Sequence, residues 1–286
     1  WVSAVCRTAL ILCSATLFAN VGIAGVSPCT KLPEDLTTFL QIPHPRGIPF
    51  AEARQFSSCS WAIQSLISAI SGSGGRTPGT IVNVVLTAGI LGQAEAVEPL
   101  IDFLESDSGY RDRTMPYEFY LAKANVPIAL ACILNQINVE LARVNTSNSE
   151  GDSLRAARRR ILDYLVEAIS DADSWERKIT WRSQLDSDAR DRDLYLVKKS
   201  IQGLGLSGDP AAACVLSWTF HEQARHWGKI GIAPADFSQL SAITRDSLAL
   251  NHDVARFPNG LMQYYESKKR EGRDLKTQIA KPPLLW

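Results

Sequence analysis

The sequence predicts an all-α protein built from antiparallel pairs of amphipathic helices. Two stretches far apart in the chain share one arrangement: an apolar stripe at helical spacing, a glycine, and an alanine four residues after that glycine. No long run alternates β-branched with polar residues, as a half-buried strand would. An apolar content of 45% in 286 residues can supply a large core. Residues 51 to 270 are therefore expected to form helix pairs with little or no sheet.

Residues 1–24 have the composition of a secretory signal peptide. Arg7 is followed by an apolar stretch without charge as far as Ala24, and Gly22 and Ala24 are the small residues that precede the expected cleavage. The same stretch is close to the shortest length that spans a membrane, so an uncleaved N-terminal anchor is the alternative. The sequence thus predicts a periplasmic or secreted protein, or a membrane-anchored one with an exported domain.

Residues 25–50 are expected to form an extended N-terminal arm, because residues 31–49 contain a short helical stretch and four prolines. Cys29 lies in this arm and Cys59 in the first strong helix that follows. In a compartment that oxidises thiols, the two would form a disulfide that ties the arm to the body. Cys132 and Cys214 lie within apolar helical runs and are expected to be buried free thiols.

Residues 51–235 are expected to form a helical repeat domain, and residues 83–104 contain its clearest unit. Gly92 marks a turn between two helices, and Ala96 is the small residue that lets their backbones approach. The stripe of the first helix is Val84, Ala88 and Leu91, and that of the second is Val97, Leu100, Ile101 and Leu104.

A degenerate unit covers residues 125–144. Its stripe is Val126, Leu130, Ile133 and Ile137, and Asn135 stands near the expected turn. The composition of residues 145–153 predicts a loop, and a strong helix is expected to follow from Leu154. The second helix of this unit is therefore displaced along the chain.

The second clear unit centres on residues 203–216. Gly208 can close one helix in the left-handed conformation, Asp209 can accept hydrogen bonds from the free N–H groups of the next, and Pro210 suits its first turn. The stripe before the turn is Leu194, Val197, Ile201 and Leu204, and that after it is Ala212, Val215, Leu216, Thr219 and Phe220.

The stretches AGILGQAEAVEPLIDFL and QGLGLSGDPAAACVL resemble HEAT repeats of the short bacterial, phycobilisome-lyase-like type, with the pattern A-x-x-L-G-x-x-x-A-V-x-x-L. Ala213 stands where the second copy would have valine. The resemblance covers about residues 80–225 and implies an α-solenoid, a fold used mostly to bind partners. Because the end units of a solenoid must hide the core, residues 236–286 are expected to form capping helices and a tail.

The charges and the histidines exclude several classes of function. Thirty basic residues balance 30 acidic ones, so no net field favours nucleic acid. The HEQARH stretch places His221 and His226 five residues apart, so their rings diverge by about 140° around a helix and do not form a zinc site. No catalytic residue, metal ligand or cofactor site is predicted.

An aromatic and basic cluster is the candidate surface for a protein or peptide partner. Its residues are Trp175, Arg177, Trp181, Arg182, Trp218 and His221. Tryptophan and arginine are the residue types most enriched at binding hot spots. The alternative is that the tryptophans fill gaps between helices while the charges pair at the surface. The run of arginines at 155–160 allows the same two interpretations. In the second of them, the acidic residues at 186–193 would neutralise the arginines.

Two functions follow from these observations. The first is an exported HEAT-like scaffold that binds a protein or peptide partner without catalysis of its own. The alternative is an enzyme or enzyme subunit of the lyase-like branch of these repeats, acting on a bound small molecule. A convergent cluster of histidines or carboxylates in one pocket would favour the enzyme, and the sequence itself contains no such pattern.

Overall fold

A computed structural model describes residues 29–42, 44, 48–72, 78–107, 116–143, 149–171, 175, 177–179, 195–222, 227–228 and 234–270. Over these ranges every regular element is a helix and there is no strand, so the all-α prediction is confirmed. The predicted signal peptide and the end of the predicted tail, from residue 271 onward, lie outside these ranges.

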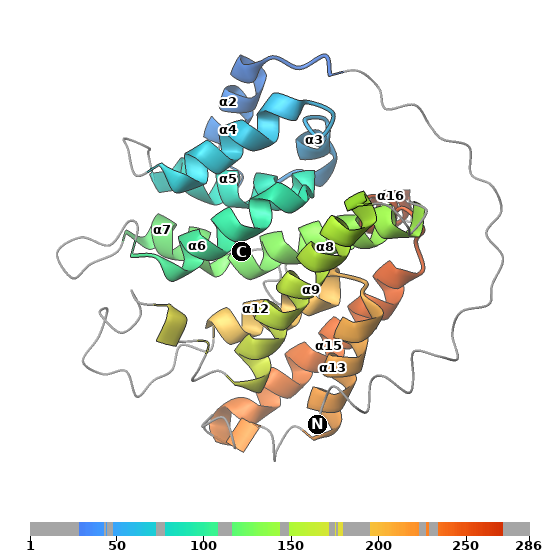
Figure 1. Ribbon diagram of the computed structural model, residues 1–286. Coiled ribbons are helices and arrows are strands. Elements are labelled where there is room, and N and C mark those ends of the chain that lie inside the picture. Colours follow the sequence, from blue (N-terminus) through green and yellow to red (C-terminus); the bar gives the residue numbers. More distant parts are fainter. Residues whose placement is uncertain are drawn as a thin grey trace.

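Figure 1 shows the arrangement of the helices. In chain order they are α2 (Pro33–Gln41), α3 (Phe50–Arg54), α4 (Ser60–Ser71), α5 (Pro78–Leu91), the short 3₁₀ helix η1 (Ala94–Ala96), α6 (Val97–Glu105), α7 (Tyr117–Ala124), α8 (Val126–Arg143), α9 (Ser149–Ser170), α12 (Tyr195–Leu206), α13 (Pro210–His221), the 3₁₀ helix η2 (Pro234–Asp236), α15 (Phe237–Ala255) and α16 (Gly260–Arg270).

Four helices, here called the first row, pack side by side in chain order: α5 on α8, α8 on α12, and α12 on α15. In Figure 1, α8 crosses the middle of the molecule, with α5 above it and α12 and α15 below it. A glycine lies at each crossing. A Cβ on Gly89 would come within 2.4 Å of the Ala129 backbone, one on Gly203 within 2.7 Å of the Pro127 carbonyl, and one on Gly205 within 2.8 Å of the Ser247 carbonyl. The absence of side chains at these glycines therefore sets how closely the helices approach.

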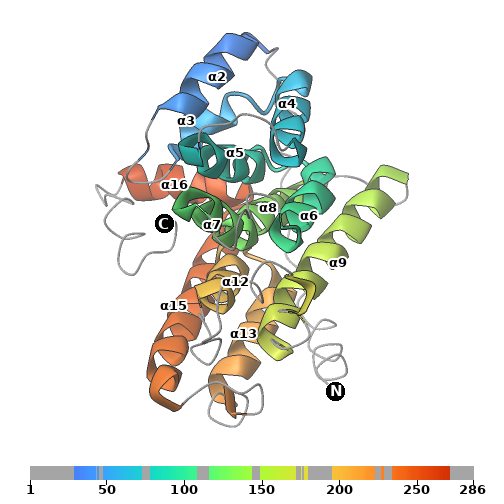
Figure 2. The same ribbon diagram turned by 90° about the vertical axis from the view of Figure 1, so that its left-hand side faces the viewer.

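A second row of helices covers one side of the first. Its members are α4, α6, α9 and α13; α4 packs on α5, α6 on α8, α9 on α8 and α12, and α13 on α12 and α15. Figure 2 shows α4, α6 and α9 following one another down one side of the molecule. The main apolar core lies between the rows, and its fully buried members include Leu66, Leu100, Ile133, Leu165, Ile201 and Leu216.

Helices from the two ends of the described chain pack on other parts of the first row. Helices α2 and α3 pack on α5, and α16 packs on α8 and α15. The two ends meet where Phe50 stacks on Tyr265, with ring centroids 4.8 Å apart. A second, smaller apolar cluster lies beneath α16 and includes Leu86, Ile128, Leu206 and Val254.

Both predicted glycine turns are present. Gly92 and Gly208 have φ angles of 75° and 60°, the left-handed conformation that ends a helix. Asp209 is the N-cap of α13 and accepts a hydrogen bond from the Ala211 N–H, with Pro210 in the first turn. Each turn leads from a helix of the first row to the next helix of the second row.

The pairing of helices differs from the prediction in the first unit. Helix α5 was expected to pack on α6 across Gly92, but it packs mainly on α8, α7 and α4. The reason is the close approach at Gly89, which places α8, and not the next helix in the chain, against α5. Helices α12 and α13, joined through Gly208, do contact each other.

The degenerate unit has no turn at Asn135, so that prediction is wrong. Helix α8 runs through this residue, and the stripe of Val126, Leu130, Ile133 and Ile137 is fully buried. The Asn135 side chain instead joins separate elements: its Nδ2 donates to the Ser207 carbonyl at 3.0 Å, and its Oδ1 accepts from the Leu261 N–H at 2.8 Å. Helix α9 already begins at Ser149, so the predicted loop is shorter than expected.

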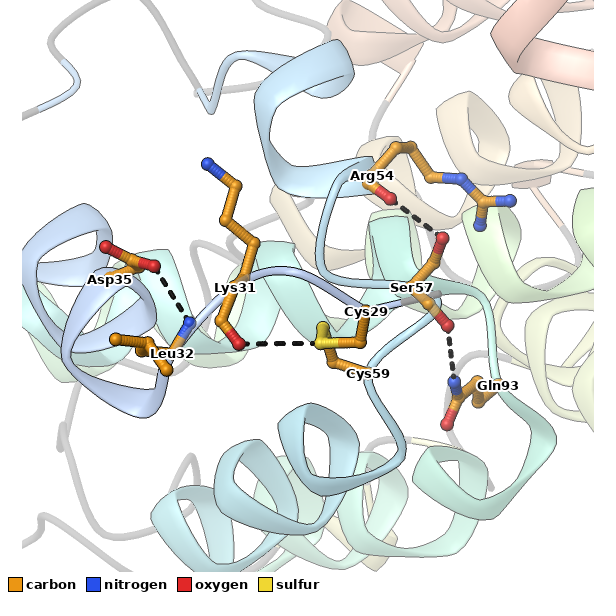
Figure 3. The surroundings of a disulfide bond; sticks show 8 residues. All are labelled: Cys29, Lys31, Leu32, Asp35, Arg54, Ser57, Cys59 and Gln93. Atoms are coloured by element: carbon orange, nitrogen blue, oxygen red, sulfur yellow. Dashed lines mark hydrogen bonds between the residues drawn. A yellow bond between two sulfur atoms is a disulfide. The ribbon is translucent and has the colours of Figure 1, made fainter. Parts of the chain in front are cut away.

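Cys29 and Cys59 form a disulfide, which is the pairing that the sequence favours (Figure 3). The bond ties the N-terminal arm to the residue that precedes α4, with the two Cα atoms 4.9 Å apart. Of the two predicted free thiols, Cys132 is free. Cys214 is disulfide-bonded, so its prediction is wrong; an apolar helical context alone does not reveal which cysteines meet in space.

Candidate functional site

The predicted partner-binding residues divide into buried and exposed ones, and Trp175 belongs to the core. Its side chain is fully buried, and its ring packs edge-on against Tyr164 of α9 with centroids 5.9 Å apart. Trp227 is also fully buried. These two tryptophans fill space between helices, which corrects the partner-binding role predicted for Trp175.

Arg177 and Lys178 follow Trp175 and have exposed side chains. The Lys178 ammonium forms an ion pair with Glu167 of α9. The predicted site residues Trp181 and Arg182 lie outside the described residues. From this segment, Arg177 therefore remains as a candidate for contact with a partner.

The end of α13 presents the other two predicted residues. Trp218 keeps 36% of its surface exposed, and His221 is exposed with its ring 5.5 Å from that of Phe220. Both lie in the last turn of the helix, and the buried face of α13 is formed by Ala212, Val215, Leu216 and Thr219. An aromatic ring and an imidazole are thus at least partly exposed at one helix end.

The two groups of candidate residues do not form one patch. In Figure 1 the short olive turn that contains Arg177 lies at the left of the molecule, and the end of α13 lies at the bottom. A partner that contacted both would have to cover the surface between them.

Arginines on α9 pair with carboxylates on α6, on α9 itself and at the start of α13. Arg160 makes a two-pronged contact with Glu98, at 2.9 Å and 3.1 Å. Arg155 pairs with Asp152, and Arg158 pairs with Asp209. Three of the four arginines in the run thus pair with carboxylates; the acids predicted for that purpose, residues 186–193, lie outside the described part of the chain.

Glu105 of α6 is the one carboxylate in this region whose pKa is raised among the described groups. Burial is the main cause, and the Tyr164 hydroxyl, Lys178 and Arg160 act in the opposite direction by stabilising the charged form. The pKa of Tyr164 is also raised, chiefly by burial. Glu105 thus interacts with groups on α9 and with Lys178 in the segment after Trp175.

Two buried lysines were not identified from the sequence. Lys123 of α7 is fully buried, and its Nζ donates to the carbonyls of Phe103 and Ser106, the latter at 2.7 Å. It thereby caps the C-terminal end of α6, as Arg54 does for α5 through the carbonyls of Ile90 and Leu91.

Lys199 of α12 is 1% exposed, and its Nζ donates to the Asn125 side-chain oxygen at 3.3 Å. Burial lowers the pKa of each lysine to about 7. The sequence does contain an indication that Lys199 is buried, because this lysine follows the buried Leu196 by three residues, a spacing that places both on one face of a helix. Lys123 lies between two alanines, and nothing in its neighbourhood marks it as buried.

No group of three or more potential metal ligands comes together within the described ranges. The run Tyr117–Arg143, which comprises α7 and α8, is long and apolar enough to cross a membrane, but 72% of its most apolar window is buried. It is the central helical stretch of this fold and packs on α5, α9 and α12.

Comparison with protein-family models, with characterised proteins and with solved structures finds no match. The described residues offer helices stacked in two rows, an exposed aromatic and imidazole pair at the end of α13, and an exposed arginine after Trp175. These groups can make contacts of the kind found in protein interfaces.

Proposed function

We propose that this protein is a HEAT-like helical repeat scaffold that binds a protein or peptide partner. The observation that carries the proposal is the order of the helices. The first row stacks α5, α8, α12 and α15 in chain order, and a second-row helix accompanies each of them. In α-solenoids, stacked helix pairs of this kind form extended surfaces to which several repeats contribute.

The partner surface that we propose lies at the end of α13, and Arg177 is a separate candidate contact. Trp218 offers a large rigid ring that is partly exposed, and His221 lies three residues later on the same helix. Aromatic rings contribute contact area at low cost in conformational entropy, and arginine adds planar hydrogen bonding to carboxylates. This composition suits a peptide or protein segment that carries acidic and apolar side chains.

We also propose that the protein acts outside the cytoplasm. The disulfide between Cys29 and Cys59 supports this, because such bonds persist mainly in oxidising compartments. Residues 1–24 would direct export as a cleaved signal peptide or, in the alternative, remain as a membrane anchor. The enzyme alternative gains no support from the described residues, which contain no convergent set of three or more histidines, cysteines or carboxylates suited to a metal.

Affinity capture with the oxidised protein tests the binding function. The wild type is immobilised, incubated with the exported fraction of the native host, and the retained proteins are quantified by mass spectrometry. The double variant Trp218→Ala/His221→Ala is expected to bind the partner at least about 30-fold more weakly, as for a hot spot worth about 2 kcal/mol. Its helical content and melting temperature should remain those of the wild type.

Tyr117→Ala is the matched control, because Tyr117 is 67% exposed and lies on α7. It removes an exposed aromatic side chain without touching α13 and should retain full capture. Equal loss of capture in the control and in the α13 variant would contradict the proposed surface. Absence of any protein retained by the wild type above a blank matrix would contradict the binding function.

A further inference from the structure

We draw no further inference here: the strongest candidate, the buried amine of Lys199 at the contact between α12 and α7, where its Nζ donates to the Asn125 side-chain oxygen, rests only on the lowered pKa of that amine, and nothing among the described residues shows a ligand or a partner that reaches it.

Discussion

Arg158 holds the carboxylate of Asp209 with two hydrogen bonds, 2.8 Å from Nε to Oδ2 and 2.9 Å from Nη2 to Oδ1. Arg158 lies on α9, and Asp209 is the fully buried N-cap of α13, so a single ion pair joins two neighbours of the second row. The Asp209 Oδ1 also accepts the Ala211 N–H at 2.8 Å. One carboxylate thus stabilises a helix end and a contact between helices.

Asp209→Ala should destabilise the fold by about 3 kcal/mol, because it removes the cap and leaves the half-buried Arg158 without its carboxylate partner. Urea unfolding followed by circular dichroism measures the change. Arg155→Ala is the control: its ion pair with Asp152 is largely exposed and should contribute less than about 1 kcal/mol. Similar losses in both variants would show that burial of the Arg158 pair is unimportant.

Gly203→Ala and Gly89→Ala should each destabilise the protein by about 1–3 kcal/mol through overpacking at the crossings of the first row. The added methyl groups would lie 2.7 Å and 2.4 Å from backbone atoms of α8, which cannot move aside as a side-chain tip can. Gly228→Ala is the control, because a Cβ there meets none of the described residues within 4 Å. A neutral Gly203→Ala, measured by thermal melting, would mean that α8 and α12 separate without cost.

The stability of the protein should rise between pH 7 and about pH 10 because of the two buried lysines. Their pKa values are about 7 in the folded state and 10.5 in the unfolded reference, so in this window the unfolded chain binds protons that the folded chain does not. Below pH 7 both amines are charged in both states, and their burial costs at most about 5 kcal/mol each.

Denaturant midpoints across this pH range test the prediction. Lys199→Met should flatten the rise, and Lys123→Met should do the same. Lys198→Met is the matched control, because this neighbouring lysine is half-buried and its amine donates to Gln239 at the surface. An identical pH dependence in the wild type and Lys199→Met would argue against a neutral amine in the folded state.

Loss of the bond between Cys29 and Cys59 should cost about 3–4 kcal/mol, the value expected for a closed loop of 30 residues. The double variant Cys29→Ser/Cys59→Ala is compared with the wild type by equilibrium unfolding. Cys132→Ala removes a free thiol without breaking a bond and is the control. Alkylation of the unfolded, non-reduced wild type should leave both Cys29 and Cys59 unmodified, and labelling of either would contradict the disulfide.

Export should yield a chain that begins near residue 25. Intact-mass measurement of the secreted or periplasmic product checks this outcome. A full-length mass confined to the membrane fraction would instead support the uncleaved anchor.

The helix ends were the best predicted part of the fold, because their signals are local. Glycine at a left-handed position, aspartate at an N-cap and proline in a first turn act within a few residues, and Gly92, Gly208 and Asp209 all behave as expected. Stripes at helical spacing likewise identified most of the buried faces of α5, α6, α8 and α13.

The packing partners of the helices could not be read in the same way. Gly89 and Gly203 look unremarkable in sequence, yet each sets a crossing between helices 40 or more residues apart along the chain, as Gly89 does with Ala129. Asn135 was expected near a turn from its local sequence. Its actual partners, Ser207 and Leu261, are distant in sequence, so no local pattern reveals them. The candidate site shows the same limit, since residue type alone did not separate the buried Trp175 from the partly exposed Trp218.

Cys132 has a consequence for the permanence of the disulfides. A free thiol in a chain with oxidised cysteines is an internal nucleophile, and attack by its thiolate would exchange one pairing for another. Burial raises the pKa of this thiol to about 12, against the opposing influence of Arg54. At neutral pH the thiol is therefore almost entirely protonated, and its thiolate is the reactive form. The packing of α8 thus suppresses disulfide rearrangement through Cys132.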